Sequence, residues 1–210
     1  MELKTVKIAL IGVADSGKSC LASMFAKEPF QFNYKPTIGL DLKVYYDTKH
    51  EFKIYFWDTA GSTNFRYMVQ TFIPSCRMIA FCFSAPSYES YKEMVQLYNF
   101  YTDNNLLIHK SVFVIATKID KCRDRQYENW AKEFTERTTL PVFFTSAKKN
   151  LGWKQIIDYI MIGNINLPSK SPEISRNYKN KNNKKKVKFS DKDQVYLFSD
   201  ENKKKDCLIS

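Results

Sequence analysis

Short apolar runs alternate with longer amphipathic segments along most of the chain. Runs of mainly apolar residues have the length and composition expected for strands covered on both faces, and they occupy residues 7–11, 78–83, 112–117 and 141–144. Segments long enough for helices lie between them, at residues 18–27, 88–104, 126–137 and 153–162. In the last of these segments the apolar residues follow helical spacing and form a one-sided stripe, which predicts a helix packed on a sheet.

Polarity alternates in two further segments, 41–47 and 51–57, around the turn residues 48–50. This pattern predicts a β-hairpin at one edge of the sheet. Together the segments predict an α/β fold with a six-stranded, mostly parallel sheet and helices on both faces. With 210 residues, of which 44% are apolar, the chain can bury one sizeable core, so we expect one domain at residues 1–167.

The formal net charge of +11 is concentrated towards the end of the chain. Residues 168–210 hold 12 Lys and Arg against 6 Asp and Glu, with many Asn and Ser and few apolar positions. Such a segment cannot bury enough apolar surface to offset the entropy lost on ordering, so we expect a disordered basic tail at 168–210. Because no clustered basic face or base-reading motif accompanies it on the folded part, we expect no nucleic acid partner.

The apolar runs, the cysteines and the histidines argue against several classes of protein. No run of about 18 apolar residues occurs and the first residues form no secretory signal, so we expect an intracellular chain without a membrane span. The five cysteines lack CxxC spacing, which argues against a disulfide framework and a zinc site. His50 and His109 lie near no other candidate ligand, which argues against a histidine-based catalytic site.

The first motif with chemical content is Gly12-Val-Ala-Asp-Ser-Gly17-Lys18-Ser19, which fits the phosphate-loop pattern GxxxxGK[ST]. It follows a predicted strand and opens a predicted helix, so successive N–H groups and the helix N-terminus face a polyphosphate. Lys18 adds a positive charge and Ser19 a hydroxyl for magnesium. The residues expected around the phosphates are Ala14, Asp15, Ser16, Gly17, Lys18, Ser19 and Cys20. This motif alone is also compatible with kinases and ATPases.

Two later motifs, Thr117-Lys118-Ile119-Asp120 and Ser146-Ala147-Lys148, narrow the choice of base. The Asp120 carboxylate can accept from the paired N–H donors of guanine, whereas adenine presents an acceptor there and would leave the charge unpaired. Lys118 can lay its stem over the ring, and the backbone around Ser146 and Ala147 can donate to the exocyclic oxygen. We therefore predict GTP or GDP as the ligand. A small-molecule kinase lacks support, since no arginine-rich lid segment is present and the Asp120 motif would go unexplained.

In this order and combination, the motifs resemble those of Ras-superfamily small GTPases over about residues 4–162, which implies a P-loop small G domain. The segments most similar to the Rab branch are Pro36-Thr37-Ile38-Gly39, with an acidic residue after it, and Phe56-Trp57-Asp58-Thr59-Ala60-Gly61. Thr117 replaces the usual Asn, as in the Rho branch. However, the 26 residues from Asp120 to Ser146 are too few for the helix that Rho proteins insert there.

The resemblance implies how magnesium and the terminal phosphate would be bound. Ser19 and Thr37 would coordinate Mg²⁺ through their hydroxyls, and Asp58 would hold it through water. Thr37 and the Gly61 amide would contact the γ-phosphate, so its loss would release both flanking segments.

The segment before Thr37 carries two aromatic residues that the resemblance assigns to the nucleotide. Phe30 would lie beside the guanine, and Tyr34 would cover the phosphates. For Phe30, a side chain that simply packs in the core is the alternative interpretation.

One departure from the family concerns hydrolysis. Ser62 follows Gly61 where the family has a Gln that orients the attacking water, and Thr63 replaces the usual Glu. Because a serine is too short for that contact, we expect slow intrinsic GTP hydrolysis, with Gly61 and Lys18 as the remaining catalytic groups beside a degenerate Ser62. Rab-type activating proteins supply Arg and Gln in trans, as the resemblance implies, so a partner could restore turnover.

Partner recognition departs from the family as well. Rab proteins present three apolar side chains to effectors between the two switch segments, and the matching residues here are Leu42, Trp57 and Phe72, with Ile38 beside them. Trp57 alone is the expected residue, and ordinary strand or helix packing is the alternative interpretation of all three. Because Phe72-Ile73-Pro74-Ser75-Cys76 replaces the usual tyrosine- and glycine-containing stretch, generic Rab effectors are not expected to bind. We expect exchange and activating proteins as further partners of a monomeric chain.

The C-terminal residues Cys207-Leu-Ile-Ser210 fit a CaaX prenylation motif, and the final Ser favours a farnesyl group on Cys207. A single lipid chain binds reversibly, and Lys203–Lys205 could add attraction to an anionic membrane surface. We expect a prenyltransferase partner and a location at the cytoplasmic face of membranes, with a cytosolic pool. Most Rab proteins end in paired cysteines, so this end is another departure.

Two functions remain open from the sequence. The first is a regulated GTP hydrolase that cycles on and off membranes, in vesicle traffic or signalling. The second is a binding module that stays loaded with GTP and recruits effectors without meaningful turnover, which Ser62 favours. The nucleotide that the purified protein carries distinguishes the two.

Overall fold

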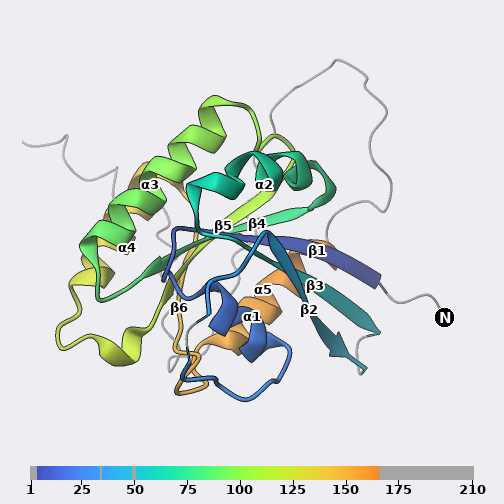
Figure 1. Cartoon of the computed structure of the whole chain (residues 1–210), viewed down its shortest axis with the longest axis horizontal. Coiled ribbons are helices and arrows are strands. Elements are labelled where there is room, and N and C mark those ends of the chain that lie inside the picture. The colour runs from blue at the N-terminus through green and yellow to red at the C-terminus, as the bar shows by residue number, and fades with distance from the viewer. Residues whose placement is uncertain (1–3, 34, 49–50, 166–210) are drawn as a thin grey trace, which may run out of the picture.

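Six strands form one sheet at the centre of the computed structural model, which describes residues 4–33, 35–48 and 51–165 (Figure 1). The strands are β1 (Lys4–Ile11), β2 (Leu40–Asp47), β3 (Phe52–Thr59), β4 (Met78–Ser84), β5 (Ser111–Thr117) and β6 (Val142–Phe144). Their order across the sheet is β2-β3-β1-β4-β5-β6. β2 and β3 pair antiparallel and the other neighbours pair parallel, which confirms the mostly parallel sheet with an edge hairpin.

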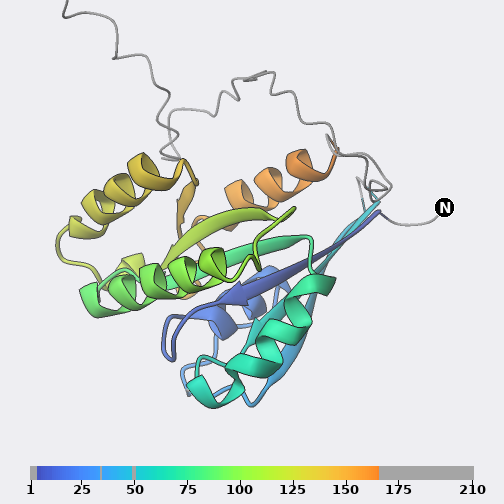
Figure 2. The same cartoon turned by 90° about the horizontal axis from the view of Figure 1, so that it is seen from above.

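Helices cover both faces of this sheet, as predicted (Figures 1 and 2). The α-helices of the described part are α1 (Lys18–Phe25), α2 (Arg66–Phe72), α3 (Tyr88–Asp103), α4 (Gln126–Thr138) and α5 (Trp153–Ile165). Short 3-10 helices are η1 (Thr63–Phe65), η2 (Ile73–Ser75) and η3 (Ile119–Lys121). α1 and α5 contribute to the apolar cluster on one face, and α2, α3 and α4 contribute to the cluster on the other.

The side chains of a central strand alternate between the two apolar clusters. In β1, Ile8 and Leu10 pack with α1 and α5, whereas Ala9 and Ile11 pack on the opposite side. Every residue of β4 is buried, which agrees with the continuous apolar run in its sequence. The sheet therefore has a covered core on each face, and the carboxyl ends of its parallel strands lie together at one edge.

The apolar pattern did not predict α2. This helix has 7 residues, and Val69 is its buried residue, so it presents no apolar stripe over two full turns. Val69 packs into the same cluster as Ile73 and α3, and this tertiary contact stabilises a helix too short to be stable alone. Elsewhere the predicted bounds differ by a few residues; β1, for example, begins at Lys4 because residues 4–6 pair with β3.

The described residues contain no helix that is both long and apolar enough to cross a bilayer. The cysteines in this part of the chain, Cys20, Cys76, Cys82 and Cys122, are free thiols. The expected tail at 168–210, with Cys207, lies outside the described residues, as do turn residues 49–50 and Tyr34.

Phe25 tests the packing of α1 on the sheet. It is fully buried, and its ring stacks on Phe56 of β3 with the ring centroids 4.2 Å apart. Because Phe25→Ala leaves a cavity there, we expect it to lower the free energy of unfolding by about 3–5 kcal/mol, measured by urea denaturation. Tyr67→Ala is the control, since Tyr67 is 77% exposed, and its effect should stay within about 0.5 kcal/mol. Similar losses for both variants would contradict the described packing.

Candidate functional site

The loop at residues 12–17 connects β1 to α1 and lies against the ends of the neighbouring strands. A Cβ atom on Gly61, just after β3, would lie 2.3 Å from the Ala14 backbone nitrogen. A Cβ atom on Gly17, which has a φ of +85°, would lie 2.6 Å from the Thr117 hydroxyl of β5. Neither position has room for a side chain, so the loop backbone is packed directly against β3 and β5.

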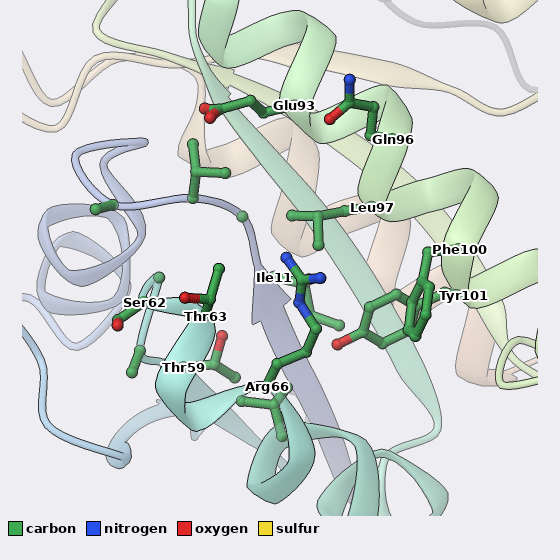
Figure 3. A pocket seen from close by; sticks show the side chains of 16 residues that line it. Ile11, Thr59, Ser62, Thr63, Arg66, Glu93, Gln96, Leu97, Phe100 and Tyr101 are labelled. Atoms are coloured by element: carbon green, nitrogen blue, oxygen red, sulfur yellow. The ribbon is translucent and has the colours of Figure 1, made fainter.

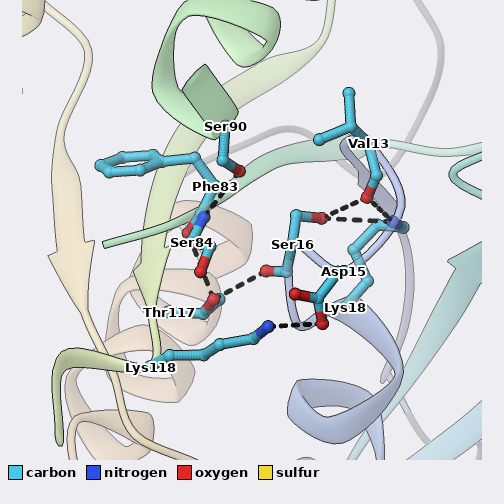
Figure 4. Close-up of polar contacts among 9 residues, drawn as sticks. All are labelled: Val13, Asp15, Ser16, Lys18, Phe83, Ser84, Ser90, Thr117 and Lys118. Atoms are coloured by element: carbon cyan, nitrogen blue, oxygen red, sulfur yellow. Dashed lines mark hydrogen bonds and ion pairs between the residues drawn. The ribbon is translucent and has the colours of Figure 1, made fainter. Parts of the chain in front are cut away.

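Lys18 turns back over this loop (Figure 4). Its ammonium group donates to the Val13 carbonyl oxygen at 2.8 Å and to the Ser16 hydroxyl at 3.2 Å. Burial lowers the pKa of Lys18 from its ordinary value, and nearby anionic groups such as Asp58 oppose that shift. A buried cation whose hydrogen-bond partners are neutral oxygen atoms favours an anionic ligand, because the ligand would compensate its lost hydration.

The three residues expected to hold magnesium come together from distant parts of the sequence. The Thr37 hydroxyl donates to Asp58 Oδ2 at 2.9 Å and lies 2.9 Å from the Ser19 hydroxyl. Thr37 has one hydroxyl proton, so Ser19 is the donor in the second contact. Asp58 is 1% exposed, and its other oxygen, Oδ1, is buried without a hydrogen-bond partner in the described structure.

This arrangement fits a divalent cation. Burial raises the pKa of the Asp58 carboxyl above its ordinary value, while the Ser19 and Thr37 hydroxyls and the charge of Lys18 oppose the shift. A cation beside the unpartnered oxygen would favour the charged carboxylate, and hydroxyl and carboxylate oxygens are the ligands that Mg²⁺ prefers. No group of three His, Cys, Asp or Glu side chains able to hold a metal occurs among the residues described, and the groups beside Asp58 here are the Thr37 and Ser19 hydroxyls.

The segments on either side of Thr37 and Asp58 are joined at their backbones. β2 begins where β3 ends, with Leu40 opposite Thr59 in the antiparallel pair. One step beyond the pair, the Ala60 N–H donates to the Gly39 carbonyl at 2.8 Å. The segment that carries Thr37 and the segment that carries Gly61 are therefore neighbours.

A cavity of about 690 Å³ runs from this loop to the predicted base motifs. The predicted residues that line it are Asp15, Gly17, Ser19, Cys20, Phe30, Thr117, Lys118, Asp120, Ala147 and Lys148. Other predicted residues, Ala14, Ser16, Lys18, Thr37, Asp58, Gly61 and Ser146, do not line it but lie in the contacts around the loop and motifs. Phe30 is half-buried beside this cavity rather than part of the core.

Hydrogen bonds hold the base motifs in place. The buried Ser146 hydroxyl donates to Asp120 Oδ1 at 2.5 Å and accepts from the Lys149 N–H, which orients the carboxylate. The Thr117 hydroxyl lies 2.7 Å from the Ser16 carbonyl oxygen and 3.2 Å from that of Phe83, so β5 is tied to the phosphate loop (Figure 4). Lys118 has a φ of +59° and its ammonium group lies 2.6 Å from Asp15 Oδ1.

Sequence reasoning missed some residues of this cavity. Phe32 is 80% exposed and meets the Phe30 ring edge-on, with the centroids 5.2 Å apart. The Lys148 ammonium group lies 5.8 Å from the centroid of the Phe32 ring. Because Phe32 is an aromatic residue between the predicted site residues Phe30 and Tyr34, its position in the sequence could have pointed to it. Trp153, the first residue of the predicted packing helix at 153–162, also lines the cavity.

Ser62 borders a second cavity of about 510 Å³, on the side of the loop that faces α3 (Figure 3). Its hydroxyl accepts from the Asn64 N–H at 3.4 Å and so caps η1. Ala14 and Gly61 line the same cavity, and α3 contributes Glu93. Here Ser62 has a local structural role, and its exposed side chain is short.

The four residues expected on a partner surface lie around β2, β3 and α2. Leu42 is opposite Trp57 in the β2–β3 pair, and the Trp57 and Phe72 rings lie 4.6 Å apart. Ile38 is 82% exposed. Trp57 Nε1 is buried without a hydrogen-bond partner in the described part of the chain. Leu42, Trp57 and Phe72 therefore lie next to one another, and Trp57 and Phe72 are partly buried.

Comparison with known proteins supplies an independent line of evidence. A sequence model described as "Ras family" matches residues 7–164. The chain is also similar to the Ras-related protein RabC of Dictyostelium discoideum. The two are 27% identical over 184 residues, which cover 84% of this chain and 91% of that protein.

Thr117 tests whether β5 holds the phosphate loop. Thr117→Val keeps the shape of the side chain but removes the donor to the Ser16 carbonyl, which is buried. We expect this variant to lose about 1–3 kcal/mol of unfolding free energy in chemical denaturation. Thr117→Ser keeps the hydroxyl and should lose clearly less. If the two variants are equally stable, the hydroxyl does not anchor the loop.

Proposed function

The chain belongs to the Ras family of small GTPases and is Rab-like, and from this premise we propose that it is a guanine-nucleotide-dependent switch at membranes. Members of this family bind GTP and GDP with Mg²⁺. The observation that carries the proposal is one continuous site, with Ser19, Thr37 and Asp58 in contact at one end and Asp120 oriented at the other. The similarity to a Rab protein favours vesicle traffic as the process in which this switch acts.

One end of the site would bind the phosphates and Mg²⁺, and the other end would bind the base. The loop amides and Lys18 would bind the phosphates, and Ser19, Thr37 and Asp58 would hold Mg²⁺ through their hydroxyl and carboxylate oxygens. Asp120 accepts the paired N–H donors of guanine because Ser146 keeps its carboxylate in one orientation. The bound nucleotide supplies the γ-phosphate whose presence or loss sets the state of the switch.

Slow intrinsic hydrolysis is part of the proposal. The hydroxyl of Ser62 is engaged with the Asn64 N–H, and the side chain is too short to orient an attacking water as a glutamine does. An activating protein that supplies an arginine and a glutamine would restore turnover, since an arginine supplied in trans is worth roughly 10³ to 10⁵ in rate.

Ser62→Gln is the direct test of this point. We expect the substitution to raise the single-turnover rate of GTP hydrolysis by about 10²-fold, the lower end of the range for one well-positioned group. The rate is measured on protein loaded with GTP and Mg²⁺, without any partner. Ser62→Ala, which changes size little, should hydrolyse at the wild-type rate. Equal rates for wild type and Ser62→Gln would show that this position does not limit hydrolysis.

A hydrolysis-deficient binding module is the second candidate, and Ser62 is the observation that favours it. Such a protein would stay loaded with GTP and recruit effectors through Ile38, Leu42, Trp57 and Phe72, where the partly buried rings leave an apolar surface. Chromatography of the nucleotide released from freshly purified protein separates the candidates. Mostly GDP supports the cycling hydrolase, and mostly GTP supports the module.

Membrane attachment through Cys207 rests on the CaaX pattern and the adjacent lysines of the sequence. We expect farnesylated full-length protein to sediment with vesicles containing anionic lipid and to dissociate in high salt, because three lysines add an electrostatic contribution. Cys207→Ser should remain in the supernatant under both conditions. Sedimentation of Cys207→Ser with the same vesicles would contradict the lipid anchor.

A further inference from the structure

One end of the sheet face that carries α2 is left uncovered by the described helices. Side chains of the β2–β3 hairpin alternate between buried and more exposed positions. In the antiparallel pair Val44 lies opposite Tyr55, and Tyr46 lies opposite Lys53. Directly opposite residues share a face, so these side chains form one group. Lys7 of β1 is opposite Tyr55 in the parallel pair and extends the group, which we call the hairpin patch.

The hairpin patch lies on the same face as Trp57, which is two positions after Tyr55 in β3. α2 contacts this face at Trp57, whose ring lies 4.6 Å from the ring of Phe72. In Figures 1 and 2 the start of β1, the start of β3 and the end of β2 project past α2. The apolar members of the patch belong to neither buried cluster, and Tyr46 is 52% exposed. Among the described residues the patch is therefore an open surface.

The charges of the hairpin patch are both positive. The Lys53 ammonium group lies 4.7 Å from the centroid of the Tyr55 ring and 5.1 Å from that of Tyr46. Hydrogen bonds with the Tyr55 and Tyr46 side chains raise the pKa of Lys53. Within the part of the chain that the structure describes, Lys53 and Lys7 form no ion pair, although Glu51 precedes β3. The neighbouring helix α2 contains no acidic residue either.

These features favour a ligand that carries carboxylates. The two rings restrict the Lys53 side chain, so little rotamer freedom is lost when its ammonium group pairs with an anion. Tyrosine rings add apolar contact area and a hydroxyl group, and tyrosine is enriched in protein interfaces. Arg77, whose N–H donates to the Lys7 carbonyl at 3.0 Å, adds a further positive charge beside the patch. Residues 168–210 have an excess of lysine, so charge repulsion argues against this tail as the occupant.

We propose that the hairpin patch binds an acidic segment of a partner protein. Carboxylates of that segment pair with Lys7 and Lys53, and an apolar side chain between them packs on the Tyr46 and Tyr55 rings. The inference goes beyond the proposed function, because the patch contains no residue of the nucleotide site. Pairing of β1 with β3 from Lys4 to Leu10 fixes the patch, so the partner binds equally well whichever nucleotide is present.

The test measures the binding of a fluorescently labelled peptide of alternating glutamate and leucine to the full chain, by fluorescence anisotropy. Lys53→Gln removes the charge and keeps the length of the side chain. Since an exposed ion pair changes an equilibrium by about 2- to 5-fold, we expect this variant to bind the peptide that much more weakly. Lys7→Gln combined with Lys53→Gln should weaken binding by about 4- to 25-fold, and salt should weaken binding to the wild type.

Lys154→Gln is the matched control. Lys154 also lies over an aromatic ring, 5.8 Å from the centroid of Trp153, but it belongs to α5 on the opposite face of the sheet. Its affinity for the peptide should equal that of wild type. A peptide with lysine in place of each glutamate should not bind.

Several outcomes would overturn the inference. They are no binding of the acidic peptide, equal binding of the lysine peptide, and an equal loss of affinity in Lys154→Gln. A different affinity for the GDP-loaded and GTP-loaded chains would assign the peptide to the surface that responds to nucleotide instead. Sedimentation of Cys207→Ser with phosphatidylserine vesicles that is lost in the double lysine variant, without peptide binding, would assign the patch to lipid.

Discussion

The site depends on how closely three backbone segments approach one another around the phosphate loop. Gly61 lies against the Ala14 amide and Gly17 lies against Thr117, with no space for a Cβ atom at either place. The Thr117 hydroxyl then binds the Ser16 carbonyl from the side. Because these contacts involve the backbone, the loop amides are oriented by the fold and need little rearrangement to bind an anion. The same packing places Asp58, near the end of β3, and Lys118, which follows β5, beside the loop.

Much of this arrangement could be predicted from the sequence. Apolar runs located the central strands, since a strand buried on both faces has no polar alternation to confuse the pattern, as in β4. The phosphate and base motifs named residues that the fold brings to one cavity, because each occurs at the carboxyl end of a parallel strand. The contact of Ser19, Thr37 and Asp58 was expected from family resemblance, and the structure supplies the distances.

Other features could not be predicted, for physical reasons. α2 is held by a tertiary contact of Val69 and has too few turns to show periodicity. The Asp15–Lys118 pair joins residues that no local pattern connects. Phe32 lies beside the cavity because its segment crosses the face of the site, and this depends on loop conformation. Ser62 and Phe72, where the sequence departs from the family pattern, lie outside the cavity that the predicted nucleotide residues line.

The hydrogen bond from the Ala60 N–H to the Gly39 carbonyl couples the segment that carries Thr37 to the segment that carries Gly61. Because both atoms of this bond belong to the main chain, a displacement of one segment is transmitted directly to the backbone of the other. A partner that moves one segment would therefore shift the other as well, and two partners that require different geometries at this bond would not bind together.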